Sequence, residues 1–433
     1  MNLHNSKNLI EMPDLSKSQN IESINLESCK SLVKVPSYFQ CLDKLTSLNL
    51  GGCSNLKHLP EISKNMEYLD LHRTDIEELP SSIWSMEKLV LLDLNFCKSL
   101  KSLPTSPCKL NSLQFLSLKG CFSLDKFPEL PRYIRDLRLS ETAIEVVPSS
   151  VESLSGLVTF DMENCKRLKS LPTSICKLKS LQRLSLSGCS NLESFPEIEE
   201  PMERLKFLNL NETAVRELPS SIENLVGLKI LQLSMCRNLD CVPDSLYNLN
   251  RLETLFLYGS FKLERLPPMS VGLCSLTVLD LSECNIFEIP DHLISLSSLE
   301  SLNLSGTKIE RIPESIKQVS GLYYLNLSNC KRLQSLPELP SLIESFDGHG
   351  CTSLESVSRT PFTQNLDQYQ VRNRYEELVL SNCLNLDKNA WSNIMTDAQL
   401  RIMRTATASL KLKDDNYVCI SLSLPPFFVK MNV

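Results

Sequence analysis

The 433-residue sequence predicts an α/β solenoid, a right-handed curved coil of short repeats whose strands form a parallel sheet on the concave face. Three observations predict this fold. The stretch Leu-x-x-Leu-x-Leu recurs along the chain, a cysteine or threonine follows it at a fixed distance, and a proline, usually after leucine, follows that residue. The segments "LQFLSLKGCFSLDKFPE" (113–129) and "LQRLSLSGCSNLESFPE" (181–197) share this whole pattern.

The residue three places after the last leucine, here called the landmark, recurs every 21 to 24 residues. The landmarks are Cys29, Cys53, Thr74, Cys97, Cys121, Thr142, Cys165, Cys189, Thr213, Cys236, Ser260, Cys284, Thr307, Cys330 and Cys351. Units of this length and pattern are leucine-rich repeats, and about fifteen follow one another. Cys29, Cys97 and Cys165 lie 68 residues apart, which indicates that a block of three repeats was duplicated.

Each repeat is expected to begin with a short strand. Leu48 and Leu50 are two residues apart and share the face that enters the core, whereas Ser47, Asn49 and Gly51 are expected to face solvent. One such strand cannot bury its apolar face alone. Neighbouring repeats therefore stack, and their strands form a long parallel sheet.

The second half of each repeat is expected to return along the convex side. A Leu-Pro pair ends the extended segment, because proline fixes φ and donates no hydrogen bond. In "SSIWSMEKL" (81–89) the apolar residues recur at helical spacing, which predicts one or two helical turns. Ser81 or Ser82 is the expected N-cap of this return leg.

The repeated cysteine is predicted to be a packing residue. Its side chain points inward from the turn, where a small, weakly polar group fits and can hydrogen-bond the backbone. Metal binding is one alternative, but the chain has no Cys-x-x-Cys pair and only five histidines, so no metal is expected. Disulfides between stacked neighbours such as Cys97 and Cys121 are the other alternative, which a reducing compartment opposes.

Composition and charge narrow the function classes. A formal net charge of -6 argues against a nucleic-acid surface. The chain has no apolar run of about 18 residues, so we expect no membrane span. Its first residues do not show the basic region followed by an apolar block that is typical of a signal peptide, so we expect a location in the cytoplasm or nucleus. No Gly-x-x-x-x-Gly-Lys-Ser/Thr loop occurs, and no cofactor is expected.

The outward residues of the strands form the candidate binding face, because stacked repeats present them as one extended surface. Aromatic residues and arginines are the types that most often anchor protein interfaces. The candidates for partner binding are Tyr68, Asp70, His72, Phe115, Arg138, Arg183, Phe207, Phe256, Tyr258 and Tyr324. Lys119, Asp161 and Glu163 are expected to lie on the same binding face. Phe256 and Tyr258 stand out most, and the alternative is a polar face that binds nothing.

Catalysis is not expected. His72 and Asp70 form the carboxylate–imidazole pair that the predicted face brings together, and the pattern specifies no nucleophile beside them. Such pairs arise readily on a varied surface. We therefore expect a binding module with no catalytic residue.

The repeat form Leu-x-x-Leu-x-Leu-x-x-Cys-x-x-Leu-x-x-Leu-Pro, followed by "LPSSI", resembles the repeats of plant TIR-type nucleotide-binding leucine-rich-repeat disease-resistance receptors. Residues 1–33 resemble the first repeats of that region, and 336–358 with 378–394 resemble its junction with a post-repeat, C-JID-like domain. The resemblance implies a solenoid over 1–357, an irregular linker over 358–374 and an incomplete post-repeat domain over 375–433. The signalling and nucleotide-switch domains of the family have no counterpart in this sequence.

The resemblance also implies a function. In the family this region senses a pathogen effector or a host protein, and the receptor's own nucleotide-binding domain is a further candidate partner. Two alternatives stay open: a constitutive scaffold for a host protein, and a truncated receptor fragment without function.

Overall fold

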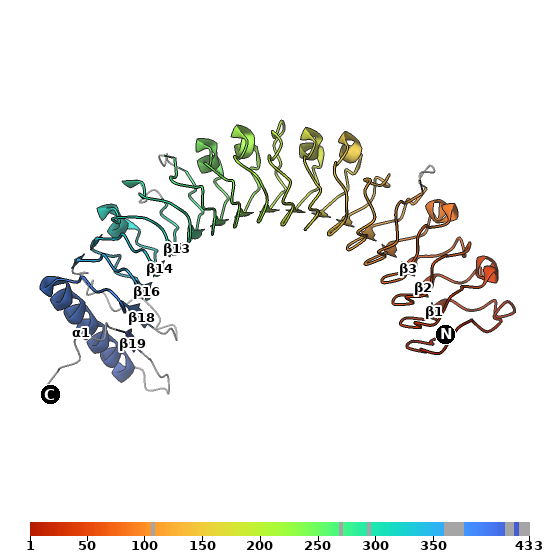
Figure 1. Cartoon of the computed structure of the whole chain (residues 1–433), viewed down its shortest axis with the longest axis horizontal. Helices are drawn as coiled ribbons and strands as arrows, with labels where there is room; N and C mark the ends of the chain where they lie inside the picture. The colour runs from red at the N-terminus through yellow and green to blue at the C-terminus, as the bar shows by residue number, and fades with distance from the viewer. Residues whose placement is uncertain (105–108, 268–271, 292–295, 359–375, 412–419, 424–433) are drawn as a thin grey trace. The chain divides into compact units, whose positions relative to one another are not determined.

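The computed structural model describes residues 1–104, 109–267, 272–291, 296–358, 376–411 and 420–423. It divides into two compact units, unit 1 (1–214 with 224–228) and unit 2 (215–223 with 229–433). In each unit, short parallel strands lie along the inner side of the curve and the helical turns lie along its outer side (Figure 1). The predicted leucine-rich-repeat solenoid is confirmed.

The strands of unit 1 are three residues long and pair in parallel, each with the next one along the chain. They are β1 (Ser23–Asn25), β2 (Ser47–Asn49), β3 (Tyr68–Asp70), β4 (Leu91–Asp93), β5 (Phe115–Ser117), β6 (Asp136–Arg138), β7 (Thr159–Asp161), β8 (Arg183–Ser185) and β9 (Phe207–Asn209). The middle residue of every strand is buried, as the alternation predicted. Aligned leucines therefore form one continuous core along the array.

Gly51 departs from the predicted alternation. It was expected to face solvent and is buried instead. The imidazole of His72, from the next repeat, packs over it, and a Cβ atom at Gly51 would lie 2.1 Å from Cε1 of His72. The absence of a side chain at Gly51 is what makes room for His72.

Unit 2, taken by itself, has the same kind of arrangement. Its main sheet contains β10 (Ile230–Gln232), β11 (Thr254–Phe256), β12 (Val278–Asp280), β13 (Ser301–Asn303), β14 (Tyr324–Asn326), β16 (Ser345–Asp347), β18 (Glu376–Val379) and β19 (Ile420–Ser423). A second, two-stranded ladder pairs β15 (Ser335–Leu336) with β17 (Ser356–Val357), and one α-helix, α1 (Lys388–Lys411), follows β18.

Within the predicted post-repeat segment, 375–433, strands β18 and β19 belong to the main sheet of unit 2. Strand β18 pairs in parallel with β16 and with β19. The expected linker, 358–374, lies outside the described residues apart from Ser358, whose backbone amide donates to the carbonyl of Leu336 at 2.9 Å. The domain boundaries stay predictions.

Several of the described return legs contain a single 3-10 turn of five residues. The described turns are η1 (Ser37–Cys41), η2 (Ser81–Ser85), η3 (Ser149–Ser153), η4 (Thr173–Lys177), η5 (Ser220–Asn224), η6 (Asp244–Asn248) and η8 (Glu314–Gln318). The predicted serine N-cap is wrong: Pro80 holds this position in η2, and no side chain caps it. Because the Ile83 amide donates directly to the Pro80 carbonyl at 3.2 Å, the short turn needs no serine.

The landmark side chains connect each repeat to its neighbour by hydrogen bonds. Cys53 and Cys121 are buried, and each thiol donates to the carbonyl of the last strand leucine of the preceding repeat, at 3.2 Å. Ser260 makes the same bond at 2.9 Å. Threonine differs, because the Thr74 hydroxyl donates to a carbonyl of its own repeat, Leu71, at 2.8 Å. The predicted packing role is confirmed, and the described cysteines are free thiols.

The residue before the landmark adopts a left-handed conformation in repeat after repeat, which turns the landmark side chain inward. Glycine often holds this position, as at Gly120 (φ 73°), but Phe96 (φ 59°) and Glu141 (φ 60°) adopt it too. The strand pattern did not predict this turn. It explains why glycine or asparagine so often precedes the landmark, since both tolerate positive φ.

Replacing one landmark cysteine tests the packing role. Cys121→Ala should lower the unfolding free energy by about 2 kcal/mol, because it removes buried volume and leaves the Leu94 carbonyl without its thiol donor. Cys121→Ser, which keeps a donor as Ser260 does, should cost less. Urea unfolding followed by tryptophan fluorescence measures both. Loss of partner binding at unchanged stability would contradict the packing role.

Candidate functional site

The strand face of unit 1 is formed by two aligned columns of strand residues, some exposed and some covered by their neighbours. The first column contains Tyr68, Leu91, Phe115, Asp136, Thr159, Arg183 and Phe207, and the second contains Asp70, Asp93, Ser117, Arg138, Asp161, Ser185 and Asn209. Because the strands are parallel and in register, side chains in one column are neighbours about 4.8 Å apart along the sheet. Six of the ten predicted binding residues fall in these columns, and His72 lies two residues beyond Asp70.

Arg138 is held in a fixed position by two kinds of contact. Its Nε and Nη2 donate to the two carboxylate oxygens of Asp136, at 3.1 and 3.0 Å. Its guanidinium lies 5.1 Å from the centre of the Phe115 ring, within reach of a cation–π attraction. The hydrogen bonds to Asp136 raise the pKa of Arg138, and the Asp161 and Asp93 carboxylates add to this. The result is a preorganised, half-exposed cation.

Arg183 and Phe207 form a second arginine–aromatic pair. They are register partners on β8 and β9, and the guanidinium lies 4.2 Å from the ring centre. Strand β7 lies between this pair and Arg138, and its Asp161 is the register partner of Arg138. The two pairs therefore lie on either side of one strand, each with an exposed arginine.

Acidic and polar groups occupy the neighbouring strands, β3 to β5. His72 Nδ1 lies 2.8 Å from Asp70 Oδ1. Burial raises the pKa of Asp93, and the Asp70 carboxylate raises it further, whereas a hydrogen bond from the Asn95 amide opposes both. Tyr68, with 48% of its surface exposed, begins the first column. Aromatic, acidic and cationic groups thus follow one another across the strand face.

Three predicted candidates lie in unit 2. Phe256, the last residue of β11, is half-buried, and Tyr258, two residues after the strand, is 43% exposed. Tyr324 belongs to β14, so β12 and β13 separate it from them. The structure thus brings together Asp70 with His72, Phe115 with Arg138, and Arg183 with Phe207. It does not bring Tyr324 to Phe256 and Tyr258, the two that stood out in the sequence.

Two residues of the site were not predicted. Asp136 is the bidentate partner of Arg138, and Asp93 lies near both Arg138 and Asp70. The signal for Asp136 was present, because residues two apart in a strand share a face. The signal for Asp93 was weaker, since only the alignment of repeats places it beside Asp70.

The structure also bears on metals and membranes. Among the residues that it describes, no group of three or more His, Cys, Asp or Glu side chains is arranged to hold a metal ion. No helix in that part of the chain is both long enough and apolar enough to span a bilayer.

Comparison with solved structures shows what fold this chain shares. A leucine-rich-repeat protein of Leptospira interrogans is 26% identical, with a TM-score of 0.59, and the match covers 83% of this chain and 90% of that one. YopM of Yersinia enterocolitica is 21% identical, with a TM-score of 0.53, over 81% and 73% of the two chains. Both are similar to this chain in fold.

Comparison of sequences shows what family this chain shares. The model described as "Disease resistance protein RPS4B-like, leucine-rich repeats" matches residues 109–192 and 177–266, and a general leucine-rich-repeat model matches 274–331.

Relatives in Arabidopsis thaliana extend the match. The disease resistance-like protein DSC1 is 37% identical over 442 residues, which covers 95% of this chain and 28% of DSC1. A probable disease resistance protein is 34% identical over 376 residues, covering 87% of this chain and 18% of that protein. Disease resistance protein RPS4B is 37% identical over 149 residues, or 34% and 13% of the two chains. This chain spans less than a third of each. The chain is therefore a leucine-rich-repeat region of the plant disease-resistance protein family.

Proposed function

We propose that this chain is a non-enzymatic recognition module that binds a pathogen effector, or a host protein that an effector alters, through the strand face of unit 1. One observation carries the proposal: two arginine–aromatic pairs, Arg138 with Phe115 and Arg183 with Phe207, lie on either side of β7 on the strand face.

The chemistry of these pairs favours a protein partner. Arginine and aromatic side chains dominate the binding energy of many protein interfaces. Arg138 is already oriented by Asp136 and Phe115, so its immobilisation on binding would lose little side-chain entropy. The flanking acidic groups, Asp93 and Asp161, would restrict the choice of partner by repelling acidic surfaces.

The relatives support the immune context, since their names describe disease resistance. Free thiols among the described cysteines support a reducing compartment such as the cytoplasm or nucleus. The nucleotide-binding domain of a receptor is a second candidate partner. A constitutive scaffold would use the same face but would bind its partner in healthy cells too.

The test compares matched double variants in plant cells with and without pathogen challenge. Arg138→Ala with Arg183→Ala should lower partner capture by about tenfold or more, because both anchors are lost. Arg237→Ala with Arg251→Ala removes the same charge from exposed positions outside the strands and should have no effect. The Phe256→Ala, Tyr258→Ala variant tests whether these two aromatic residues of unit 2 contribute to partner capture.

The outcomes separate the alternatives. If the wild type captures a partner only after pathogen challenge, and capture depends on Arg138 and Arg183, the result supports a sensor. If the wild type captures the partner equally with and without challenge, the result supports a scaffold. Equal capture by both arginine variants and the wild type would contradict the proposed face. A thermal unfolding curve for each variant shows that the fold is intact.

A further inference from the structure

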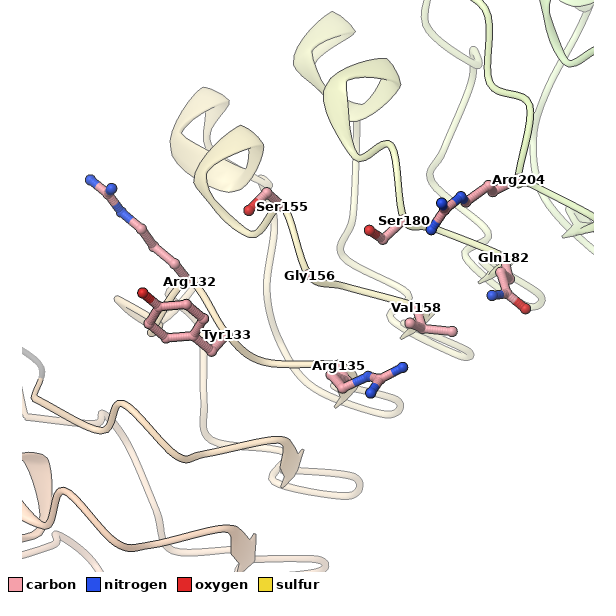
Figure 2. A pocket seen from close by; sticks show the side chains of 9 residues that line it. All are labelled: Arg132, Tyr133, Arg135, Ser155, Gly156, Val158, Ser180, Gln182 and Arg204. Carbon is pink, nitrogen blue, oxygen red and sulfur yellow. The ribbon is translucent and has the colours of Figure 1, made fainter.

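Unit 1 has a second candidate interaction surface, which lies away from the strand face. It is a pocket of about 370 Å³, here called the flank pocket, and it is lined by Arg132, Tyr133, Arg135, Ser155, Gly156, Val158, Ser180, Gln182 and Arg204. These residues precede the strands of four successive repeats, so the pocket lies at the edge where the chain enters β6 to β9. Figure 2 shows Arg132 and Tyr133 at one end, Ser180, Gln182 and Arg204 at the other, and Arg135 with Val158 between them.

The charge of the flank pocket is unusual for this chain. Three arginines and no acidic residue line it, although the whole protein carries a net charge of -6. Some cations elsewhere in unit 1 are paired, as Lys169 is with Glu145 and Lys177 is with Glu152, both at 2.8 Å. Within the described part of the chain, the three arginines of the pocket make no ion pair.

The remaining lining suits a polar, anionic ligand. Ser155, Ser180 and Gln182 offer hydroxyl and amide groups for hydrogen bonds. Tyr133, 61% exposed, provides an aromatic surface at one end. At Gly156 even a Cβ atom would lie 3.5 Å from the nearest atom, the carbonyl oxygen of Arg132, so the backbone here is not crowded.

We propose that the flank pocket binds an acidic segment of a protein partner, with Arg135 and Arg204 each receiving a carboxylate. The planar guanidinium matches a carboxylate with two parallel hydrogen bonds. The pocket has room for a few side chains and not for a long polyanion. The small volume of the pocket favours a short acidic segment over the continuous phosphate backbone of a nucleic acid.

The probe for this proposal is a fluorescein-labelled peptide of four glutamates, titrated with the full chain at low salt and followed by fluorescence anisotropy. Binding should weaken as salt is added. Arg135→Gln with Arg204→Gln should weaken it about tenfold or more. Arg73→Gln with Arg167→Gln removes the same charge from exposed positions at the opposite ends of the strands and should leave the affinity unchanged.

Further variants and a second ligand distinguish the proposal from its alternatives. The Arg135→Lys, Arg204→Lys variant keeps the two positive charges but cannot donate two parallel hydrogen bonds to a carboxylate, so it should bind the peptide more weakly than the wild type. Equal weakening by the two glutamine variants, or no binding by the wild type, would overturn the proposal. Tighter binding of a twelve-nucleotide single-stranded RNA, with the same arginine dependence, would overturn it in favour of nucleic acid. Arg138→Ala with Arg183→Ala should bind the peptide normally, so this test stands apart from that of the strand face.

Discussion

Raising the pH from 8 to 10 is expected to remove several kcal/mol from the unfolding free energy, because the buried landmark thiols resist ionisation. Burial raises the pKa of Cys97 to about 11 and the pKa values of Cys53 and Cys284 to about 12. It raises the pKa of Cys165 and Cys330 as well. An ordinary thiol titrates near 8.5 in an unfolded chain.

The sign follows from proton binding. Above the ordinary thiol pKa, the unfolded chain releases protons that the folded chain keeps, so folding stability declines as pH rises. The stabilisation is complete below the unfolded pKa and is lost progressively as the pH approaches the folded pKa. Each thiol whose folded pKa is 11 or higher contributes about 2 kcal/mol of this loss between pH 8 and 10, and the losses at several landmarks add up.

Urea unfolding at pH 7.5, 9 and 10 measures this loss. Cys284→Ser is the matched control, because Ser260 already fills a landmark with a hydroxyl that donates to the preceding repeat and does not titrate in this range. Between pH 8 and 10 this variant should lose less unfolding free energy than the wild type, by about 2 kcal/mol. A urea midpoint that stays constant from pH 8 to 10 would show that burial does not protect the thiols from ionisation.

Gly227→Ala is expected to lower the unfolding free energy by about 3 kcal/mol, since adjacent repeats touch backbone to backbone at this point. A Cβ atom on Gly227 would lie 2.0 Å from the carbonyl oxygen of Glu203 and 2.6 Å from its carbonyl carbon. Neither atom can rotate away, as a flexible side chain could. The repeats would have to separate locally, which disturbs the packing of the leucines behind them.

Gly156 provides the control for Gly227, because it occupies the same position just before the first leucine of its repeat. There a Cβ atom would lie 3.5 Å from the nearest carbonyl oxygen, an ordinary contact. Gly156→Ala should therefore be neutral or slightly stabilising, since alanine also restricts the unfolded chain. Equal urea midpoints for the two alanine variants would contradict the close approach at Gly227.

The sequence was sufficient to predict the repeat array. Leu48 and Leu50 must share a face, and only stacking can bury that face, so few arrangements are possible. The N-cap was predicted incorrectly because a serine after proline is typical of an α-helix start, whereas the five-residue 3-10 turn begins at Pro80 itself. Burial of Gly51 depends on where His72 places its ring, which repeat spacing does not determine.

The candidate site was predicted less completely. The repeat pattern identified which positions lie on the strand face, but the contacts between their side chains depend on register and on side-chain direction. The pairing of Arg183 with Phe207 follows from alignment of the repeats, whereas the position of Arg138 depends on its hydrogen bonds to Asp136. The flank pocket was missed because its arginines lie before the strands, in segments that the leucine pattern leaves unconstrained.

The in-register pairing of unit 1 has a consequence for how such a gene can change. Each repeat meets the next through one parallel strand pair, and usually through a landmark hydrogen bond. A block that starts and ends at the same point of the repeat can be gained or lost without altering the junction. The 68-residue spacing of Cys29, Cys97 and Cys165 marks such a block. Unequal recombination between copies of this block would add or remove three strands of the strand face at once. The surface can therefore diversify by gain or loss of whole strands as well as by point mutation.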